Sequence, residues 1–348
     1  MKDRMREAIE AARYAHPHPN PRVGALVLHP NGTVVGRGVH QGPGESHAEV
    51  TALIQAGSAT AGGTLVVNLE PCNHHGRTPP CSEAIIEAGI SRVIVAVMDP
   101  DPNVNGKGIA RLQQAGLEVV VGILEAEAEK LDPGYFHHRR TGLPRVTLKA
   151  ALTMDGAVAA RDRSSRWITS PEARRDGHEL RAEADAVMIG AGTLISDNPA
   201  LTVRLEGGSD RRPIPIVIGG NRPLPPDAKL FERPAIVFSP GPCEVAAEVI
   251  VLPGRAGVDL EKALVMLGER GILDVLVEGG PSLARSLLDG GLVQRGVFYY
   301  GARLAGGTGL GPFGGRFESL GDATELQVEE VRRVGADVRV EFLVEGGS

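Results

Sequence analysis

Two stretches of the N-terminal half decide its fold: His47-Ala48-Glu49, and Glu70-Pro71-Cys72-Asn73-His74-His75-Gly76-Arg77-Thr78-Pro79-Pro80-Cys81. Together they offer one imidazole and two thiols as metal ligands, with a glutamate two positions after the histidine. Three such ligands leave one position of a tetrahedral zinc ion open, which is typical of a catalytic site. We therefore predict that His47, Cys72 and Cys81 bind one Zn²⁺ ion.

The spacing also predicts where these side chains lie. His47 and Glu49 would point to nearly opposite sides of a helix, so they can cooperate only if the metal lies beyond the helix start. Pro79-Pro80 cannot continue a helix but can precede one, so we expect Cys81 to open a helix that runs to Ala88. The N–H groups at helix starts favour thiolates, which would aim these ligands at one point.

A closed structural zinc site is the alternative to a catalytic one. It would need a fourth protein ligand, which His74 or His75 can supply, and it would leave Glu49 without a role. In the catalytic alternative, zinc lowers the pKa of a bound water, and Glu49 transfers the water's proton to departing ammonia. Zinc deaminases combine His/Cys/Cys ligands with such a glutamate. The motif therefore predicts hydrolytic removal of an amino group from a ring.

The distance between the two cysteines indicates the substrate class. Eight residues separate Cys72 from Cys81, whereas nucleic-acid deaminases typically carry Pro-Cys-x-x-Cys. The intervening His74 and Arg77 can hold a phosphate or a polar ring edge, although a solvated Arg77 explains the sequence equally well. A net charge of −6 and 3% aromatic residues argue against a general nucleic-acid binder. A nucleic-acid deaminase and a non-enzymatic scaffold stapled by zinc are the competing hypotheses.

Composition describes an ordinary globular protein. With 348 residues, of which 42% are hydrophobic and 23% charged, the chain is long enough for two domains. Three cysteines do not make a disulfide framework, and Cys243 is expected to be structural. The charged N-terminus does not resemble a signal peptide, and no apolar run is long enough to span a membrane. We expect a cytoplasmic protein that binds neither membrane nor nucleic acid.

Strand and helix signals alternate over residues 1–122, which predicts a mixed α/β fold. Asn31-Gly32 between two apolar runs predicts a hairpin of strands 23–28 and 33–39. The other predicted elements are helices at 2–15, 47–56, 82–88 and 109–115, and strands at 64–69, 92–98 and 117–123. Residues 125–140 are expected to form one connector helix.

The pattern breaks at Gly142-Leu143-Pro144, so we predict domains at 1–143 and 144–348. Ser170-Pro171-Glu172 has the residues of a helix start and predicts a helix to residue 184. The other predicted elements are strands at 145–152, 186–189, 214–218, 235–239, 249–252, 273–278 and 293–299, helices at 259–269 and 282–288, and a closing hairpin of 325–332 with 337–343.

Two glycine-containing turns follow predicted strands. Gly190-Ala191-Gly192 lacks a third glycine, and no helix is expected after it, so it does not match a dinucleotide-binding fingerprint. Glu278-Gly279-Gly280-Pro281-Ser282 precedes a predicted helix, whose free N–H groups would form a phosphate cradle. A tight strand-to-helix turn explains it equally well. Trp167, the sole tryptophan, is either a packing anchor or a surface against which a flat ring lies.

Several motifs together resemble the bifunctional deaminase–reductases of riboflavin biosynthesis. In the first half these are Asn20-Pro21-Arg22-Val23-Gly24, the two metal stretches, and Asp99-Pro100-Asp101-Pro102 followed by Gly106-Lys107-Gly108. In the second half they are Lys149 to Gly156 (KAALTMDG), Ser165-Arg166-Trp167-Ile168-Thr169, Asp197-Asn198-Pro199 and Glu278-Gly279-Gly280-Pro281-Ser282. The resemblance implies a three-layer α/β/α cytidine-deaminase-like domain, followed by a dihydrofolate-reductase-like α/β domain.

The resemblance also implies two reactions. The first is zinc-dependent deamination of 2,5-diamino-6-(5-phosphoribosylamino)pyrimidin-4-one. The second is reduction by NADPH of the ribosyl group of 5-amino-6-(5-phosphoribosylamino)uracil to ribityl. The implied small-molecule partners are phosphorylated pyrimidines, and we expect a homo-oligomer. One departure is Asp101, where the family usually has asparagine. An acid there would repel a phosphate, so Asp101 is assigned no binding role.

Site residues follow from the same resemblance. Glu49 is implied as the proton carrier, and Asn20, His74 and Arg77 as contacts of the pyrimidine. Lys149 and Asp197 are candidates to handle the proton that accompanies hydride transfer. The residues implied for the ribose-phosphate substrate, with the arginines as phosphate clamps, are Ser165, Arg181, Leu201, Arg204 and Glu278. Those implied for NADPH are Ala151, Trp167, Thr193, Asp197, Gly280, Pro281, Ser282, Leu283, Ala284, Arg285 and Ser286.

Overall fold

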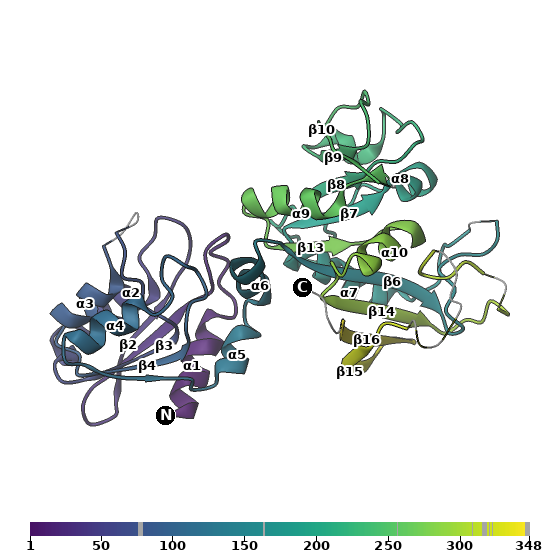
Figure 1. The fold of residues 1–348 in the computed structure, drawn as a ribbon. Coiled ribbons are helices and arrows are strands. Elements are labelled where there is room, and N and C mark those ends of the chain that lie inside the picture. The colour runs from purple at the N-terminus through teal and green to yellow at the C-terminus, as the bar shows by residue number, and fades with distance from the viewer. Residues whose placement is uncertain are drawn as a thin grey trace. The chain divides into compact units, whose positions relative to one another are not determined.

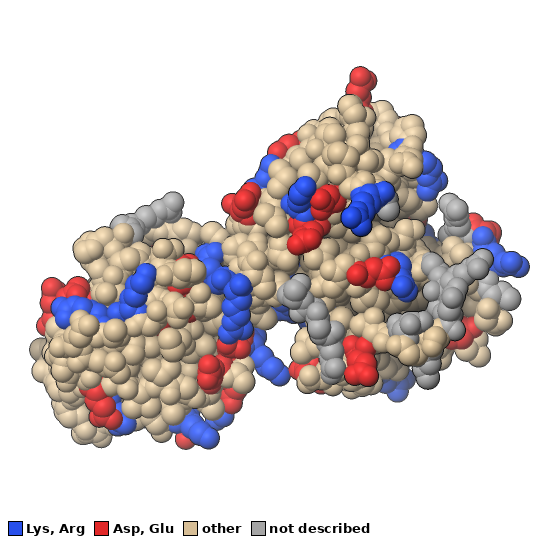
Figure 2. Space-filling model, viewed as in Figure 1, with Lys and Arg blue, Asp and Glu red and all other residues tan. Residues whose placement is uncertain are grey.

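Two units make up the chain, Met1–Gly142 and Leu143–Ser348 (Figure 1). The computed structural model describes residues 1–75, 79–162, 164–255, 257–307, 309–314, 319, 321 and 323–344. Over these residues, no helix is both long and apolar enough to cross a lipid bilayer. Figure 2 shows acidic and basic side chains interspersed on the visible face of each unit.

The first unit is built on a five-stranded sheet with the order β2-β1-β3-β4-β5. Its strands are β1 (Gly24–Leu28), β2 (Val34–Val39), β3 (Thr64–Leu69), β4 (Arg92–Val97) and β5 (Glu118–Val121). Strands β1 and β2 pair antiparallel, so the hairpin predicted from Asn31-Gly32 is confirmed. Strands β3, β4 and β5 run parallel, which places the carboxyl ends of β3 and β4 at the same edge of the sheet.

Helices cover both faces of this sheet. They are α1 (Lys2–Ala12), α2 (Ala48–Ala56), α3 (Cys81–Glu87), α4 (Lys107–Gln114) and α5 (Glu125–Glu129), with a short 3₁₀ turn η1 (Gly57–Thr60). A Cβ on Gly24 would lie 2.2 Å from the carbonyl oxygen of Ala8 in α1, and one on Gly38 would lie 1.9 Å from that of Ala48 in α2. Gly38 pairs with Ala25, the neighbour of Gly24, so the two glycines face opposite sides of the sheet. The unit therefore has the predicted three layers, with glycines where helix and strand approach most closely.

The expectation of one connector helix over residues 125–140 is wrong. The chain forms two helices there, α5 and α6 (Pro133–Thr141). Pro133 is the first residue of α6, where its missing N–H and fixed φ are tolerated, whereas its ring would clash inside a continuous helix. Helix α6 ends at Gly142, whose φ of 79° is the left-handed conformation that commonly ends helices.

The second unit is built on a nine-stranded sheet with the order β10-β9-β8-β7-β13-β6-β14-β16-β15. All neighbours from β10 to β14 pair in parallel, and β16 and β15 add the predicted antiparallel hairpin at one edge. The strands are β6 (Arg145–Thr153), β7 (Ala186–Gly190), β8 (Ile214–Ile218), β9 (Ile236–Ser239), β10 (Glu248–Val251), β13 (Asp274–Val277), β14 (Arg295–Gly301), β15 (Leu326–Val334) and β16 (Asp337–Val344), with a separate short pair β11 (Pro253–Gly254) and β12 (Gly257–Val258).

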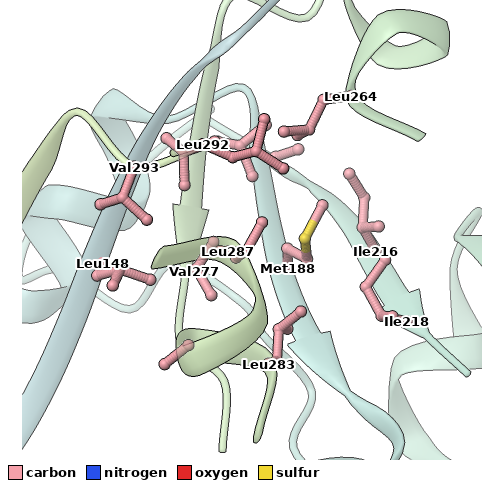
Figure 3. Close-up of a cluster of buried hydrophobic side chains, with 14 of the residues drawn as sticks. Leu148, Met188, Ile216, Ile218, Leu264, Val277, Leu283, Leu287, Leu292 and Val293 are labelled. Atoms are coloured by element: carbon pink, nitrogen blue, oxygen red, sulfur yellow. The ribbon is translucent and has the colours of Figure 1, made fainter. Parts of the chain in front are cut away.

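The parallel part of this sheet is buried on both faces. The helices are α7 (Pro171–Glu183), α8 (Ala191–Asp197), α9 (Leu260–Glu269) and α10 (Pro281–Asp289), with a 3₁₀ turn η2 (Lys229–Glu232). Met188 packs with Leu264 of α9 and Leu287 of α10 in one core (Figure 3), whereas its neighbours Val187 and Ile189 pack in the other. The near-continuous apolar strands therefore reflect a parallel sheet covered on both sides.

Two predicted features at helix starts have different outcomes. The Oγ of Ser170 accepts a hydrogen bond from the N–H of Ala173 at 3.2 Å, so the predicted cap of α7 is confirmed. The expectation that no helix follows Gly190-Ala191-Gly192 is wrong, because α8 begins at Ala191. This helix has seven residues and no side-chain cap at its start, so the local sequence carried few of the signals that mark a helix.

Candidate active sites

The predicted metal ligands of the first unit come together at the ends of three elements. His47 immediately precedes α2, Cys72 follows β3 after two residues, and Cys81 is the first residue of α3. The ligand atoms lie within 4.8 Å of one another, and His47 Nδ1 is 3.1 Å from Cys81 Sγ and 3.6 Å from Cys72 Sγ. Nitrogen and sulfur ligands of a tetrahedral zinc ion lie roughly 3.6 Å apart. The three side chains thus fit a single zinc ion.

A hydrogen bond joins the two thiols in this arrangement. A hydrogen bond from Cys81 lowers the pKa of Cys72 to about 4, and the bond to Cys72 together with burial raises the pKa of Cys81. The backbone N–H of Cys81 also points at Cys72 Sγ, at 3.5 Å. A thiolate stabilised by a thiol, an imidazole and a helix-start N–H is the donor chemistry that zinc selects.

Glu49 lies beside the ligands but outside the ligand set. It is the second residue of α2 and is only 3% exposed. Burial raises the pKa of Glu49 to about 7, with the charge of Cys72 adding to the rise and that of His47 opposing it. Its carboxyl group also hydrogen-bonds with the Cys81 thiol. The side chains of His47 and Glu49 therefore meet at the start of α2, as the sequence predicted. A buried carboxyl group with such a pKa can exchange protons near neutral pH.

A polar cluster borders the metal ligands, and it includes a residue that sequence reasoning missed. Asn20 Nδ2 lies 2.9 Å from His40 Nε2, and His40 Nδ1 lies 3.2 Å from the carbonyl oxygen of Ser46. The His40 ring packs edge-on against His47, with centroids 5.2 Å apart, and burial lowers the pKa of His40. His40 directly follows β2, so only the pairing of the hairpin brings it here. His74 is exposed, and Arg77 lies outside the described residues.

A buried carboxylate organises the loop that follows β4. Glu70 accepts hydrogen bonds from the N–H groups of Gly106 at 2.9 Å and Gly108 at 3.0 Å, so it caps the start of α4.

The carboxylate of Asp101, where asparagine was expected, lies 3.1 Å from the guanidinium of Arg139 in α6. This ion pair compensates the charge of Asp101, which explains how an acid is accommodated at this position.

In the second unit, the carboxyl ends of β6, β7, β8 and β13 border a cavity of about 1090 Å³. Ligands of open parallel sheets bind at this edge. All but one of the predicted reductase residues line the cavity: Lys149, Ala151, Ser165, Trp167, Arg181, Thr193, Asp197, Leu201, Arg204, Glu278, Gly280, Pro281, Ser282, Leu283, Ala284 and Ser286. The exception is Arg285, which is not part of the cavity lining and pairs with Asp289 one helical turn later at 2.7 Å.

The glycine turn after β13 is followed by helix α10, and the start of this helix lines the cavity. Gly280 precedes α10 and no side chain caps the helix start, while Pro281 at the first position has no N–H to satisfy. A Cβ on Gly279 would lie 2.9 Å from Leu283 Cδ2, so a side chain at this position would require the Leu283 side chain to move. Ser282 and Leu283 line the cavity, so the free N–H groups of the first turn are available to an anion there.

A carboxylate between two cations stands at the centre of the lining. Glu278 pairs bidentately with Arg181, with one contact at 3.0 Å, and lies 3.7 Å from Lys149 Nζ. Burial alone would raise the pKa of Glu278, but the charges of Arg181 and Lys149 outweigh it and lower that pKa to about 2. The remaining Nη1 of Arg181 donates to the carbonyl oxygen of Thr202 at 2.9 Å. Arg204 bonds through its Nη1 to the hydroxyl of Thr202 at 3.3 Å and is exposed to solvent.

Four further cations line the cavity that sequence reasoning did not assign: Arg166, Arg174, Arg222 and Lys229. Arg222 follows β8, and Lys229 opens η2. In the described part of the chain, neither of these two side chains has an ion-pair or hydrogen-bond partner. The segments that carry Arg222 and Lys229 have no recognisable motif, so only the order of the strands brings them to the cavity.

Comparisons with known proteins agree with this geometry. The model of the RibD C-terminal domain matches residues 144–340, and that of the cytidine and deoxycytidylate deaminase zinc-binding region matches residues 1–97. The riboflavin biosynthesis protein RibD of Escherichia coli K12 is 40% identical over 341 residues, covering 92% of each chain. That of Aquifex aeolicus is 40% identical over 354 residues, covering 98% of each chain.

Solved structures extend the likeness to both units. Acinetobacter baumannii RibD matches with a TM-score of 0.90 and 34% identity, over 99% of this chain and 98% of that one. A Thermotoga maritima diaminohydroxyphosphoribosylaminopyrimidine deaminase/5-amino-6-(5-phosphoribosylamino)uracil reductase matches with a TM-score of 0.86 and 33% identity, over the same shares. The predicted fold class and the predicted zinc-binding deaminase region are thereby confirmed. The chain belongs to the RibD family of bifunctional deaminase–reductases of riboflavin biosynthesis.

Proposed function

We propose that residues 1–143 deaminate 2,5-diamino-6-(5-phosphoribosylamino)pyrimidin-4-one and that residues 144–348 reduce the ribosyl group of the deaminated product with NADPH. The observation that carries the first half is the convergence of His47, Cys72 and Cys81 within 4.8 Å beside buried Glu49. The cavity at the carboxyl ends of the second sheet, with its cationic lining and glycine turn, supports the other half.

In the deaminase site, His47, Cys72 and Cys81 would hold zinc, which supplies Lewis acidity when bound. Glu49 accepts a proton from the attacking water and delivers it to the leaving amino group, because its carboxyl is buried beside the ligands and can hold a proton near neutral pH. Asn20 and His40 offer hydrogen-bonding groups at the rim of this site and orient the pyrimidine. His74 and Arg77 are proposed as further contacts.

In the reductase site, NADPH supplies the hydride when bound, and the protein supplies orientation and charge. The helix-start N–H groups of α10 receive the pyrophosphate. Three donors of Arg181 are engaged by Glu278 and Thr202, so Arg204 is the freer cation for the substrate phosphate. Lys149, held at 3.7 Å from Glu278, and Asp197 are the groups proposed to handle the accompanying proton.

The two activities can be measured with the purified full-length protein. We expect about one zinc ion per chain, ammonia release from the diaminopyrimidinone phosphate, and NADPH oxidation only with the deaminated product. A chelator should stop ammonia release and leave oxidation of NADPH by supplied deaminated substrate unchanged. Folded, zinc-loaded protein that shows neither reaction would refute the proposal.

The preference for NADPH over NADH is proposed to depend on Arg222. Its loop follows β8, two strands from the glycine turn after β13, which corresponds to roughly 10 Å across the sheet. Arg222 has no side-chain partner among the described residues, so it can bind the 2′-phosphate that only NADPH carries. We expect Arg222→Gln to weaken NADPH binding about 10-fold and to leave NADH binding unchanged. Titration calorimetry measures both affinities, and equal losses of affinity for NADPH and NADH would refute this assignment. Arg285→Gln is the control, because it removes the same charge at a residue that does not line the cavity.

Cellular location and assembly are further parts of the proposal. Cys72 and Cys81 lie close enough to be oxidised together, so a zinc site of this kind needs the reducing conditions of the cytoplasm.

Strand β15 lies at the edge of its sheet and exposes apolar side chains, with Val328 59% and Val331 62% exposed. Such an edge supports association into a homo-oligomer.

A further inference from the structure

The sole tryptophan of the chain stands in an unusual position. Trp167 lines the cavity of the second unit and yet is 59% exposed. An exposed indole contributes no packing to the core, so the packing-anchor interpretation does not apply to it. A large flat ring at the wall of a ligand cavity instead offers a surface for stacking, provided that the ring is held in one orientation.

Arg174 supplies the contact that can hold the ring. This residue belongs to α7 and is half-buried, and its guanidinium carbon lies 4.4 Å from the centroid of the Trp167 ring. Nη1 of Arg174 donates a hydrogen bond to the carbonyl oxygen of Thr169 at 2.7 Å, which ties the guanidinium to the backbone two residues after the indole. Arg166 lies farther from the ring, at 5.9 Å, and bonds weakly to the carbonyl oxygen of Asp197 at 3.4 Å.

These contacts differ from those of an ordinary surface arginine. Arg174 has no acidic partner in the described ranges. Its guanidinium instead contacts the Trp167 ring and donates to the carbonyl oxygen of Thr169. A guanidinium plane stacks on an indole with both dispersion and cation–π attraction, which lysine reproduces only in part. Helix α7, which carries Arg174, begins at Pro171 and is capped by Ser170, three residues after the indole.

We propose that Arg174 is a positioning residue: it holds the Trp167 ring in place so that the indole forms a fixed wall of the nucleotide site. The proposal rests on the proposed function, since it assumes that NADPH binds in this cavity. Although Arg174 itself lines the cavity, it then acts on the cofactor through Trp167. Without the guanidinium the indole gains rotamer freedom, which must be lost again when the cofactor binds, so binding weakens.

The single tryptophan makes the test direct, because all indole emission reports this one site. In the full-length protein we expect Arg174→Ala to lower the fluorescence anisotropy of Trp167 and to weaken NADPH binding about 5- to 10-fold. KM for NADPH should rise by the same factor while kcat stays nearly constant, and Arg174→Lys should recover part of the loss. Arg175→Gln is the matched control, because the neighbouring Arg175 pairs with the exposed Glu206 at 2.8 Å and does not line the cavity.

A double-mutant cycle shows whether Arg174 acts through the indole. NADPH binding to Trp167→Ala and to Trp167→Ala/Arg174→Ala, followed by the emission of the reduced nicotinamide, should be equally weak. A further loss in the double variant would mean that Arg174 contacts the cofactor itself and would overturn the proposal. Unchanged anisotropy and affinity in Arg174→Ala would also overturn it. If Arg174→Ala does not fold, Arg174→Gln replaces it in the same cycle. Failure of the unmodified protein to bind NADPH would instead refute the proposed function.

Discussion

Replacing Glu49 by glutamine is expected to lower the rate of deamination by about 100- to 10,000-fold while zinc remains bound. Glutamine has nearly the same shape and occupies the same buried position in α2, but it cannot accept the proton of the attacking water. The ligand atoms of His47, Cys72 and Cys81 are not altered, so the metal content should stay at that of the unmodified protein. Ammonia release and metal analysis of the same preparation measure both quantities.

The reductase reaction provides the internal control for this variant. NADPH oxidation with supplied deaminated substrate should be unchanged, because Glu49 belongs to the first unit and the cavity proposed to bind NADPH is lined by residues of the second. Glu83→Gln is a matched variant, since Glu83 also lies in the first turn of a helix but is paired with Arg111 at 2.6 Å on the surface. A purely structural zinc site predicts that Glu49→Gln deaminates normally. Loss of both activities in folded protein would contradict the independence of the two units.

Replacing Glu278 by glutamine is expected to destabilise the second unit by about 3 kcal/mol. The change leaves the cations of Arg181 and Lys149, which are 14% and 20% exposed, without the carboxylate that compensates them. Chemical denaturation followed by Trp167 emission measures this, because the sole tryptophan lies in the second unit. Glu248→Gln is the control: Glu248 pairs with Arg270 in an exposed ion pair, whose loss should cost less than about 1 kcal/mol.

The same substitution should remove a specific pH dependence. The pKa of Glu278 falls from an ordinary 4.5 to about 2, so the folded unit binds fewer protons than the unfolded chain between these values. The carboxylate therefore stabilises the fold fully above pH 4.5, and this contribution of about 3 kcal/mol is lost as the pH falls towards 2. The difference in stability between the unmodified protein and Glu278→Gln should shrink over this interval. A difference that is constant with pH would show that the ion pair is not its source.

The metal site could be predicted residue by residue because its signals are local. A histidine before a helix, a cysteine just after a strand and a cysteine placed by Pro79-Pro80 at a helix start each have a conformation that the neighbouring residues determine. The glycine turn at 278–282 was recognised for the same reason. The helix over residues 191–197 was not, because seven residues without a side-chain cap carry little helical signal.

Some residues that reach a site from distant segments were not identified from the sequence. His40 meets Asn20 only through the pairing of β1 with β2, and Arg222 reaches the cavity only because β8 lies two strands from β13. Arg174 was assigned no role, since nothing in its sequence neighbourhood shows that its guanidinium lies over the Trp167 ring.

The amino-acid sequence by itself predicted the chemical groups of this protein: the side chains that can bind zinc, a carboxyl group beside them, and a glycine turn that precedes a helix. Tertiary structure alone decided which charges are compensated, as for Asp101 with Arg139 and Glu278 with Arg181 and Lys149, and which have no partner among the described residues, as for Arg222. The physical reason is range. Backbone preferences act over a few residues, whereas charge pairing and ring stacking depend on the three-dimensional meeting of segments that can lie a hundred or more residues apart in the chain, as Lys149 and Glu278 do.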